Sequence, residues 1–308
     1  MKAPLVIDIK GNSLDDGPGI RSVVFFKGCP LDCMWCHNPE SKKSKAEISF
    51  DPEKCIGCGT CIDNCNAGAL SRDNPFFVNR DACTSCFACV QECPAGALVR
   101  IGREITQEEI IEKILRDKPF FDTSGGGVTF SGGEPALHMN FIAGLIMKLK
   151  SFGIHTLIET CGYFNLDEFI KTVLPYTDMI YMDIKFVDPK MHKRYCGVDN
   201  TVILENFVKL HEFSLPGEFK IIPRTPLIPG ITDTAENLVS IAHFLHDHGV
   251  KQIRLLPNNP IWHKKCFNIG IISSFTEDSP MRKWLPPDAL DKSQEVFEQL
   301  HINFQRKL

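Results

Sequence analysis

The sequence predicts an α/β fold, a partial (β/α)6 TIM-like barrel that is interrupted by a small cysteine-rich insertion. Three observations lead to this prediction. Six strand-like apolar stretches alternate with helical patterns, and crossover helices of this kind produce a parallel sheet. Six units are too few to close an eightfold barrel, so one side is expected to stay open. The length of 308 residues and the 43% apolar composition suit one such domain with an insertion.

The expected strands and helices follow from apolar periodicity and capping residues. A short leading strand is expected at residues 5–9, before a turn rich in Gly and Pro at residues 15–19. Thr106 and Glu109 form a capping box that opens the first helix after the insertion. The six main strands are expected at residues 20–27, 128–130, 156–158, 179–184, 219–222 and 253–256. Helices are expected at residues 110–115, 141–149, 166–174, 202–213, 238–245 and 288–300, and residues 257–287 are expected to be irregular.

Charge and hydropathy narrow the class of protein. A formal net charge of −4 provides no basic surface of the kind that binds nucleic acid. Residues 1–10 lack the apolar stretch of a signal peptide, and no apolar run reaches the length of a membrane span. We therefore expect a cytoplasmic protein with no nucleic-acid or membrane partner. Fourteen cysteines at short spacings in such a protein indicate metal ligation rather than disulfides, and an anaerobic or microaerobic setting.

The first cysteine group is a short loop after an apolar strand. Cys29, Cys33 and Cys36 form a C-x3-C-x2-C pattern just after the apolar residues 23–26. Three thiolates so close together can hold three irons of a cubane cluster and leave the fourth iron open for a substrate or cofactor. A structural zinc loop is the alternative, but zinc prefers two separated ligand pairs and a closed shell. The pattern therefore favours a catalytic iron–sulfur cluster.

The second cysteine group lies in residues 47–100, which lack long apolar periodicity. The pattern C-x2-C-x2-C-x3-C occurs twice there, and each copy is followed by a similar phrase, Ala-Gly-Ala-Leu. This is the signature of bacterial two-cluster ferredoxins, in which the fourth cysteine of each run ligates the other cluster. Two zinc sites are the alternative. The rule assigns one 4Fe–4S cluster to Cys55, Cys58, Cys61 and Cys93, and another to Cys83, Cys86, Cys89 and Cys65. We expect a ferredoxin-like domain at residues 47–100, inserted into a barrel made of residues 1–46 and 101–308.

Polar motifs follow the predicted strands. In barrels of this type the active site is built at the carboxyl ends of the strands. The motifs lie at residues 28–40, 131–135, 159–162, 183–185, 224 and 258–259, one after each of the six strands. Random placement of polar residues would not give this regular pattern, so we expect these groups to share one site.

The motifs also carry a resemblance. The C-x3-C-x-aromatic-C pattern with Trp35 resembles the radical S-adenosylmethionine (radical SAM) enzymes. Two stretches, Ser-Leu-Asp-Asp-Gly-Pro-Gly-Ile-Arg at residues 13–21 and Trp-Cys-His-Asn-Pro-Glu at residues 35–40, narrow it to the activating enzymes of glycyl radical enzymes. The likeness covers nearly the whole chain and weakens after about Pro257. The activating enzyme of pyruvate formate-lyase lacks the two-cluster insertion, so the chain resembles activators of other partners.

The resemblance implies a SAM site around the open iron, which would chelate the amino and carboxylate groups of SAM. Gly132 and Gly133 would let the backbone come close, and Glu134 would pair with the ammonium group. The tryptophan and histidine that flank the third loop cysteine would line the adenine pocket, unless the tryptophan is simply a packed core residue. The residues concerned in the loop are Trp35, Cys36 and His37.

Further cofactor-binding residues follow from the later strand ends. Asp183, Ile184 and Lys185 match the family's Asp-x-Lys motif, close to the cofactor and a monovalent cation. Glu159 stands where relatives often carry aspartate. Arg224 either neutralises the cofactor carboxylate or caps a surface. After the sixth strand, the place of the relatives' histidine is taken by an asparagine, with a histidine nearby as the alternative: these are Asn259 and His263.

The implied reaction begins with one electron entering the loop cluster. SAM is then cleaved, and a 5′-deoxyadenosyl radical takes a hydrogen atom from a backbone glycine of a large glycyl radical enzyme. The expected reductant is flavodoxin or ferredoxin, and the two ferredoxin-type clusters either relay electrons or dock the reductant. The protein is expected to be a monomer. Asp16 is expected to position the incoming glycine loop, and an ordinary turn-stabilising aspartate is the alternative.

Two other classes of function remain open at this point. One is a radical SAM enzyme that acts on a small molecule or peptide, and the other is an electron-transfer iron–sulfur protein with a degenerate barrel. Three cysteines lack metal spacing and are expected to be buried, inert thiols: Cys161, Cys196 and Cys266.

Overall fold

The computed structural model describes residues 3–272 and 275–304. Its centre is a run of six adjacent parallel strands, which confirms the predicted parallel α/β sheet. In spatial order these strands are β2 (Arg21–Phe26), β6 (Gly127–Gly132), β7 (His155–Thr160), β8 (Met179–Asp183), β9 (Lys220–Leu227) and β10 (Gln252–Pro257). Each lies within a few residues of its predicted position, because all six are short apolar runs between helical patterns.

Three more strands extend the sheet. The leading strand β1 (Leu5–Ser13) pairs antiparallel with β2 and is longer than predicted, since it continues to the turn at residues 15–19. β5 (Arg103–Glu104) pairs antiparallel with β1, and β11 (Asn303–Phe304) pairs parallel with β10. Within the described residues, β5 and β11 are therefore the two edges of this sheet.

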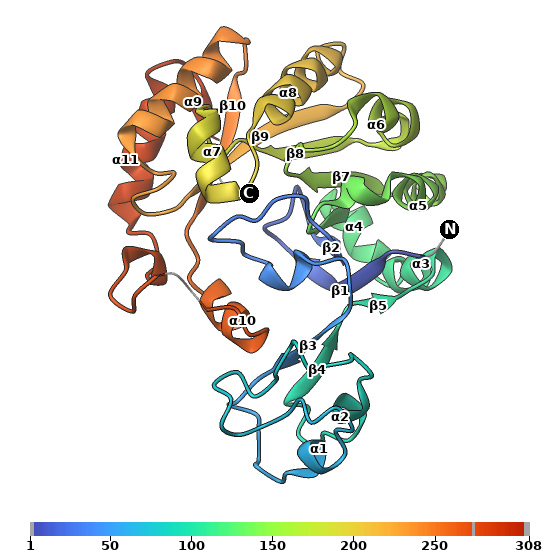
Figure 1. Ribbon diagram of the computed structural model, residues 1–308. Coiled ribbons are helices and arrows are strands. Elements are labelled where there is room, and N and C mark those ends of the chain that lie inside the picture. Colours follow the sequence, from blue (N-terminus) through green and yellow to red (C-terminus); the bar gives the residue numbers. More distant parts are fainter. Residues whose placement is uncertain (1–2, 273–274, 305–308) are drawn as a thin grey trace.

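Helices cover the sheet on its outer side (Figure 1). The predicted helices are α3 (Gln107–Leu115), α5 (Met139–Ser151), α6 (Leu166–Thr172), α8 (Thr201–Ser214), α9 (Ala235–Asp247) and α11 (Pro287–Glu298). The capping box of Thr106 and Glu109 is present at the start of α3. Short 3-10 turns are η1 (Pro39–Ser41), η2 (Pro135–His138), η3 (Leu174–Tyr176) and η4 (Pro280–Arg282).

Three helices packed around the main sheet were not predicted: α4 (Lys118–Ser124), α7 (Pro189–Cys196) and α10 (Trp262–Asn268). The last corrects the prediction that residues 257–287 are irregular. Trp262 and Cys266, one helical turn apart, are both buried in the main hydrophobic core, and this contact gives α10 its inward face. Residues 273–274, in the same stretch, lie outside the described residues.

The stretch at residues 47–101 forms a second unit, which lies to one side of the main sheet (Figure 1). Its sheet is the antiparallel pair β3 (Glu47–Phe50) and β4 (Leu98–Ile101), and two one-turn helices lie between these strands in the chain, α1 (Thr60–Asp63) and α2 (Ala88–Gln91). The unit has a small core of its own, in which the Phe50 and Phe77 rings stack at 4.3 Å between centroids. No helix among the described residues has both the length and the apolar character to cross a membrane.

Candidate active site

The cluster loop, residues 28–40, leaves the carboxyl end of β2 and is anchored on the end of α7. The backbone N–H of Asp32 donates to the Cys196 carbonyl at 2.8 Å, and the N–H of Met34 donates to the Tyr195 carbonyl at 3.0 Å. These two bonds fix the backbone on both sides of the middle cysteine. Of the predicted cluster ligands, Cys33 is buried, and Cys29 and Cys36 are half-buried.

Two further thiols contact these ligands. The Cys196 thiol donates a hydrogen bond to Cys33 and lowers the pKa of Cys33 to about 7, although burial opposes the shift. Cys161 hydrogen-bonds Cys29. Both residues are buried, as predicted, but they are not isolated. Cys161 belongs to the strand-end motif at residues 159–162, which is a sequence signal for its place in the site, whereas nothing in the sequence places Cys196 beside the loop.

Gly132 and Gly133 allow the end of β6 to pass against the start of the cluster loop. A Cβ on Gly133 would lie 2.0 Å from the Gly28 carbonyl oxygen, and a Cβ on Gly132, whose φ is +114°, would lie 2.3 Å from the Phe26 carbonyl oxygen. Both distances are far below contact, so only glycine fits. The close approach predicted from the sequence is therefore, in the first place, an approach to the chain itself.

Glu134 follows these glycines and is fully buried. One carboxylate oxygen accepts from the Ala136 N–H at 2.9 Å, and the other accepts from the Cys161 N–H at 2.7 Å. The Thr160 hydroxyl lies 2.9 Å from both oxygens. Burial raises the pKa of Glu134, although these hydrogen bonds oppose the shift. The carboxylate joins the ends of β6 and β7, so an ammonium group would have to compete with the protein's own donors for it.

Four charged side chains from the neighbouring strands β7, β8 and β9 and the residues just after β8 form one buried ion-pair network. Arg224 was predicted to follow the fifth strand, but β9 continues to Leu227, so Arg224 lies within the strand. Arg224 is at the centre of the network: its Nη1 pairs with Glu159, and its Nε donates to Asp183 at 2.9 Å. Lys185 Nζ donates to the other Asp183 oxygen at 3.2 Å. The Ser131 hydroxyl donates to Glu159 at 2.7 Å. The network thus collects the predicted polar groups of three neighbouring strands, with Asp183 and Arg224 directly opposite in the sheet.

The pKa shifts show which pairs are strong. Burial raises the pKa of Asp183, but Arg224 and then Lys185 outweigh it and hold that pKa below its ordinary value. Burial lowers the pKa of Lys185, but Asp183 and the nearby Cys33 outweigh it, so the ammonium stays charged. For Glu159 burial dominates and raises the pKa, although Arg224 opposes it. Two cations therefore face two carboxylates at a site that also reaches the cluster loop.

Of the remaining predicted cofactor residues, some are packed in the core and others contact one another. Trp35 is buried, with its ring centroid 6.2 Å from those of Phe186 and Tyr195, as a packed core residue would be. The Asn259 side chain hydrogen-bonds the His37 imidazole, so these two predicted residues meet. Ile184 is buried, and its N–H donates to the Arg224 carbonyl at 2.8 Å. His263 stacks on Trp262 and contacts the Met281 carbonyl at 3.3 Å.

Asp16 lies half-buried in the turn between β1 and β2. Its carboxylate accepts a hydrogen bond from the Ser13 hydroxyl, and its carbonyl accepts one from the Thr129 hydroxyl at 2.6 Å. Both bonds stabilise the turn. The pKa of Glu159, which burial raises and Arg224 lowers, is raised further by the Asp16 charge. Asp16 is therefore a turn residue that is also close enough to act on the site.

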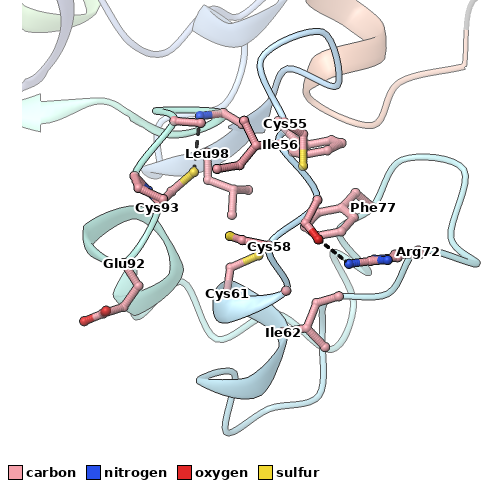
Figure 2. Close-up of a pocket in the computed structure, with 16 residues that line it drawn as sticks. Cys55, Ile56, Cys58, Cys61, Ile62, Arg72, Phe77, Glu92, Cys93 and Leu98 are labelled. Carbon is pink, nitrogen blue, oxygen red and sulfur yellow. Dashed lines mark hydrogen bonds between the residues drawn. The ribbon is translucent and has the colours of Figure 1, made fainter.

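The second unit contains two cavities, each lined by four of its eight cysteines. Figure 2 shows Cys55, Cys58, Cys61 and Cys93 around the first. The second cavity is lined by Cys65, Cys83, Cys86 and Cys89. These are the two sets that the crossing rule gives. The fourth cysteine of each run also accepts an equivalent backbone hydrogen bond, at 3.3 Å from Ala69 to Cys65 and at 3.2 Å from Ala97 to Cys93.

The donor sets suit iron–sulfur clusters. Each cavity of the second unit presents four thiols, and the cluster loop presents three. Thiolate-only ligation is typical of iron–sulfur clusters. Among residues 3–272 and 275–304, no three His, Cys, Asp or Glu side chains are arranged to hold a single metal ion.

Comparison with known proteins identifies the family. The profile of the radical SAM superfamily matches residues 80–260, a 4Fe-4S dicluster domain matches residues 47–94, and a 4Fe-4S single cluster domain matches residues 15–67. The trans-4-hydroxy-L-proline dehydratase activating enzyme of Clostridioides difficile is 40% identical over 266 residues, which cover 85% of this chain and 86% of that protein. The chain belongs to the radical SAM activating enzymes of glycyl radical enzymes.

Other relatives of this activating enzyme agree. The isethionate sulfite-lyase activating enzyme of Nitratidesulfovibrio vulgaris is 37% identical over 267 residues, 85% of this chain and 86% of that protein. A radical SAM methyltransferase from Sphaerobacter thermophilus shares the fold, with a TM-score of 0.54 and 11% identity over 98% of this chain and 76% of that protein. The chain is thus an oxidoreductase that uses radical SAM chemistry to activate a partner enzyme.

Proposed function

We propose that Cys29, Cys33 and Cys36 bind a 4Fe–4S cluster with one open iron, and that SAM binds there, at the strand ends of a partial (β/α)6 barrel formed by residues 1–46 and 101–308. The observation that carries this proposal is the shared site: the loop thiols, the Gly132–Gly133 turn and the buried ion-pair network lie together. Ionisable groups are rarely buried without a function or a partner. When bound, the cluster and SAM supply a one-electron cleavage that yields a 5′-deoxyadenosyl radical.

The chain's own residues bind and orient SAM in this proposal. Arg224 and Lys185 are the cations available to its carboxylate, and Asp183 holds both in place. Glu134 positions the turn after β6 rather than serving only as a partner for the ammonium group. The residues around the adenosine are Trp35, Cys36, His37 and Asn259, with Ile184 and Glu159 supporting the network.

A monovalent cation is not needed in this assignment. The two carboxylates that would hold it, Glu159 and Asp183, already have the Arg224 guanidinium between them. Lys185 adds a second positive charge. The formal charge of the four groups is zero, so electrostatic attraction for a further cation is weak.

The second unit is proposed to be a ferredoxin-like domain, residues 47–100, with two auxiliary 4Fe–4S clusters. The two four-cysteine cavities support this assignment. Together with the loop cluster, the protein would hold three clusters. Cys55, Cys58 and Cys86 are exposed, which suits electron entry from flavodoxin or ferredoxin. Exposed thiolate-ligated clusters also require a reducing compartment, so we place the protein, as a monomer, in the cytoplasm.

The partner is a glycyl radical enzyme, whose backbone glycine must reach the bound SAM. The named relatives act with a dehydratase in one case and a sulfite-lyase in another, so the proposal concerns the class of partner and not its substrate. Asp16, in the turn beside the site, is proposed to help position the incoming glycine loop. No nucleic acid takes part.

Iron content and product formation test the proposal. Anaerobically reconstituted protein should bind about twelve irons, four for each of three clusters. With dithionite and SAM it should form methionine and 5′-deoxyadenosine, and with its partner it should give the EPR signal of a glycyl radical. Four irons together with bound zinc would remove the two auxiliary clusters, and absence of 5′-deoxyadenosine from the fully loaded protein would overturn the assignment of the loop.

A further inference from the structure

Helix α10 lies between the cluster loop and the second unit. Its inward face, Trp262 and Cys266, is buried in the main core, which fixes the helix on the main domain. Figure 1 shows α10 beside β3, next to the place where the second unit joins the main sheet. The helix is therefore placed to connect the two cysteine-bearing regions.

On one side, α10 holds the cluster loop through Lys265. Its Nζ donates to the His37 carbonyl at 3.0 Å and to Asn38 Oδ1 at 2.9 Å, and it pairs with Glu40 at 3.0 Å. These are the residues that directly follow Cys36. One ammonium group thus contacts three residues within four positions of the chain after Cys36, a geometry that restrains the loop more than a single surface ion pair would.

On the other side, α10 holds the second unit through Arg80. The guanidinium donates to the Asn268 carbonyl at the end of α10 at 3.2 Å and to the Ile48 carbonyl of β3 at 2.8 Å. A cation at a helix carboxyl end is favourable because the last carbonyls lack intrahelical partners. The Phe267 and Phe76 rings add an aromatic contact, with centroids 5.4 Å apart.

A second, parallel connection runs through Lys27 at the end of the β2 strand. Its buried Nζ donates to the Glu40 carbonyl at 2.7 Å and to the Glu47 carboxylate of β3 at 2.8 Å. Glu40 is thus held from both sides, by Lys27 on the main sheet and by Lys265 on α10. The same short segment of the cluster loop takes part in both connections to the second unit.

We propose that α10 fixes the position of the second unit against the cluster loop, and that Lys265 and Arg80 are positioning residues for electron transfer between their clusters. This inference rests on the proposed function, which puts clusters at both places. One electron leaves a reduced auxiliary cluster and enters the loop cluster; the reductant of the flavodoxin or ferredoxin class replaces it. Because the rate of electron tunnelling falls exponentially with distance, a looser joint slows the transfer without altering any ligand.

Two variants of the reconstituted holoenzyme test this role, Lys265→Met and Arg80→Met. The control is Lys292→Met, which removes an exposed pair with Asp288 on α11, 3.3 Å apart, far from both regions in the fold. Four quantities are measured. They are the iron content, the midpoint potentials, the distance distribution between the loop cluster and the auxiliary clusters by pulsed dipolar EPR, and the rate at which a ferredoxin-class reductant reduces the loop cluster.

In Lys265→Met and Arg80→Met we expect the wild-type iron content and midpoint potentials, together with a broader distance distribution. Reduction of the loop cluster should be slower by at least about tenfold, or 1.4 kcal/mol. The control should behave like the wild type. A wild-type distance distribution in both Lys265→Met and Arg80→Met would overturn the proposal. If the native protein holds four irons rather than about twelve, the proposed function itself fails, and that result differs from unchanged distances at full iron content.

An exposed pair provides a further test if either variant loses iron. Lys264 on α10 pairs with Glu53 of the second unit, and Asp51 lies 3.8 Å away. Lys264→Glu should broaden the distance distribution, and adding Glu53→Lys should narrow it again, because the reversed pair restores the attraction. Independent effects of the two changes, with no recovery in the double variant, would overturn the proposal.

Discussion

The cluster loop and the second unit both present cysteine thiols, but the surroundings of those thiols differ. Around the loop, Cys33 is buried and lies near Lys185 of an ion-pair network and near the thiol of Cys196. In the second unit, Cys55 and Cys58 are exposed, and the first cavity is lined mainly by apolar side chains, with Arg72 and Glu92 as its charged residues (Figure 2).

Under the proposed function, this difference distinguishes the region that does chemistry on a substrate from the region that transfers electrons. Charges buried in a medium of low dielectric act strongly and at fixed positions, as the binding of a zwitterionic cofactor requires. Exposed thiolate-ligated clusters with backbone hydrogen bonds are suited to taking up and releasing electrons. In this proposal cysteine sulfur is the ligand in both regions, and the groups around it determine whether the cluster acts on a substrate or carries electrons.

Removing one cysteine from each region gives the strongest test of the difference between the cluster loop and the second unit. Cys33→Ala should abolish SAM cleavage, because the open-iron cluster is lost, while Cys58→Ala should leave that cluster able to bind SAM. Each variant should retain about eight of roughly twelve irons if only its own cluster is lost. The measurements are iron content and 5′-deoxyadenosine formed with dithionite as a direct reductant. Wild-type cleavage by Cys33→Ala would contradict the assignment of the loop.

The buried network predicts a large difference in stability between the two regions. Arg224→Met leaves the Glu159 and Asp183 carboxylates without their shared counterion, and removing one partner from a buried ion pair costs about 3–5 kcal/mol. The matched change in the second unit is Arg72→Met, since Arg72 is exposed and donates only to the Gly57 carbonyl at 2.5 Å. That variant should stay within about 0.5 kcal/mol of the wild type.

Denaturant unfolding under anaerobic conditions measures both changes. Equal losses in the free energy of unfolding for Arg224→Met and Arg72→Met would show that the buried network contributes no more to stability than an exposed arginine of the second unit. In that case the distinction between a charged, buried site and an exposed one would lose its energetic basis.

Local patterns allowed much of this comparison to be predicted from the sequence. Six apolar runs predicted the parallel strands, because a buried strand is a local feature. The spacing of Cys55–Cys65 and Cys83–Cys93 predicted the two sets of four that the cavities bring together. The strand-end rule predicted that Glu159, Asp183 and Arg224 would meet, although it did not predict that they would bind one another.

What the sequence did not predict depends on contacts between distant segments. Helix α10 is short and of mixed polarity, and it is fixed by Trp262 in the main core and by Arg80 from the second unit, about 180 residues away in the chain. The contact of Cys196 with Cys33 arises only because α7 packs its end against the cluster loop. Neither contact leaves a periodic or spaced signal in the sequence.

The pH dependence of stability should also reflect the buried region. His192 on α7 is buried, its Nδ1 contacts the Val198 carbonyl at 2.7 Å, and burial lowers its pKa to about 4. The unfolded chain binds a proton at this residue below about pH 6.5, and the native protein does so only near pH 4. The free energy of unfolding should therefore fall as the pH drops through this window, by up to about 3 kcal/mol.

Unfolding at pH 7.5 and pH 5 measures this dependence. His192→Asn removes the titrating group, so the part of the pH dependence that it causes should disappear. The exposed His246 is the control, and His246→Asn should keep the wild-type dependence. If His192→Asn also kept it, acid sensitivity would have to come from elsewhere than the helix that anchors the cluster loop.

Asp16 tests whether the region around the cluster loop also contacts the partner enzyme. If it positions the glycine loop, Asp16→Ala should slow glycyl radical formation by at least about tenfold, or 1.4 kcal/mol, while SAM cleavage without partner stays nearly unchanged. Its bonds to Ser13 and Thr129 give the competing account, in which it only stabilises the turn. Equal losses in both assays, together with lower thermal stability, would support the turn account.

The smallest expected effect comes from the Cys196 thiol, which donates a hydrogen bond to Cys33 in the cluster loop. Hydrogen bonds to ligand sulfur stabilise the more negative, reduced cluster, so they raise its potential. Cys196→Ala removes the donor to Cys33 and should lower the potential of the loop cluster by about 30 mV, roughly a threefold change for a one-electron couple in which 59 mV is tenfold. Cys196→Ser keeps a donor and should recover most of the shift.

Cys266, buried in α10 with Lys42 and Glu40 as its charged neighbours, is the control thiol. An EPR redox titration that found Cys196→Ala and Cys266→Ala alike would mean that this thiol only fills space, and that the buried charges alone set the loop apart from the second unit.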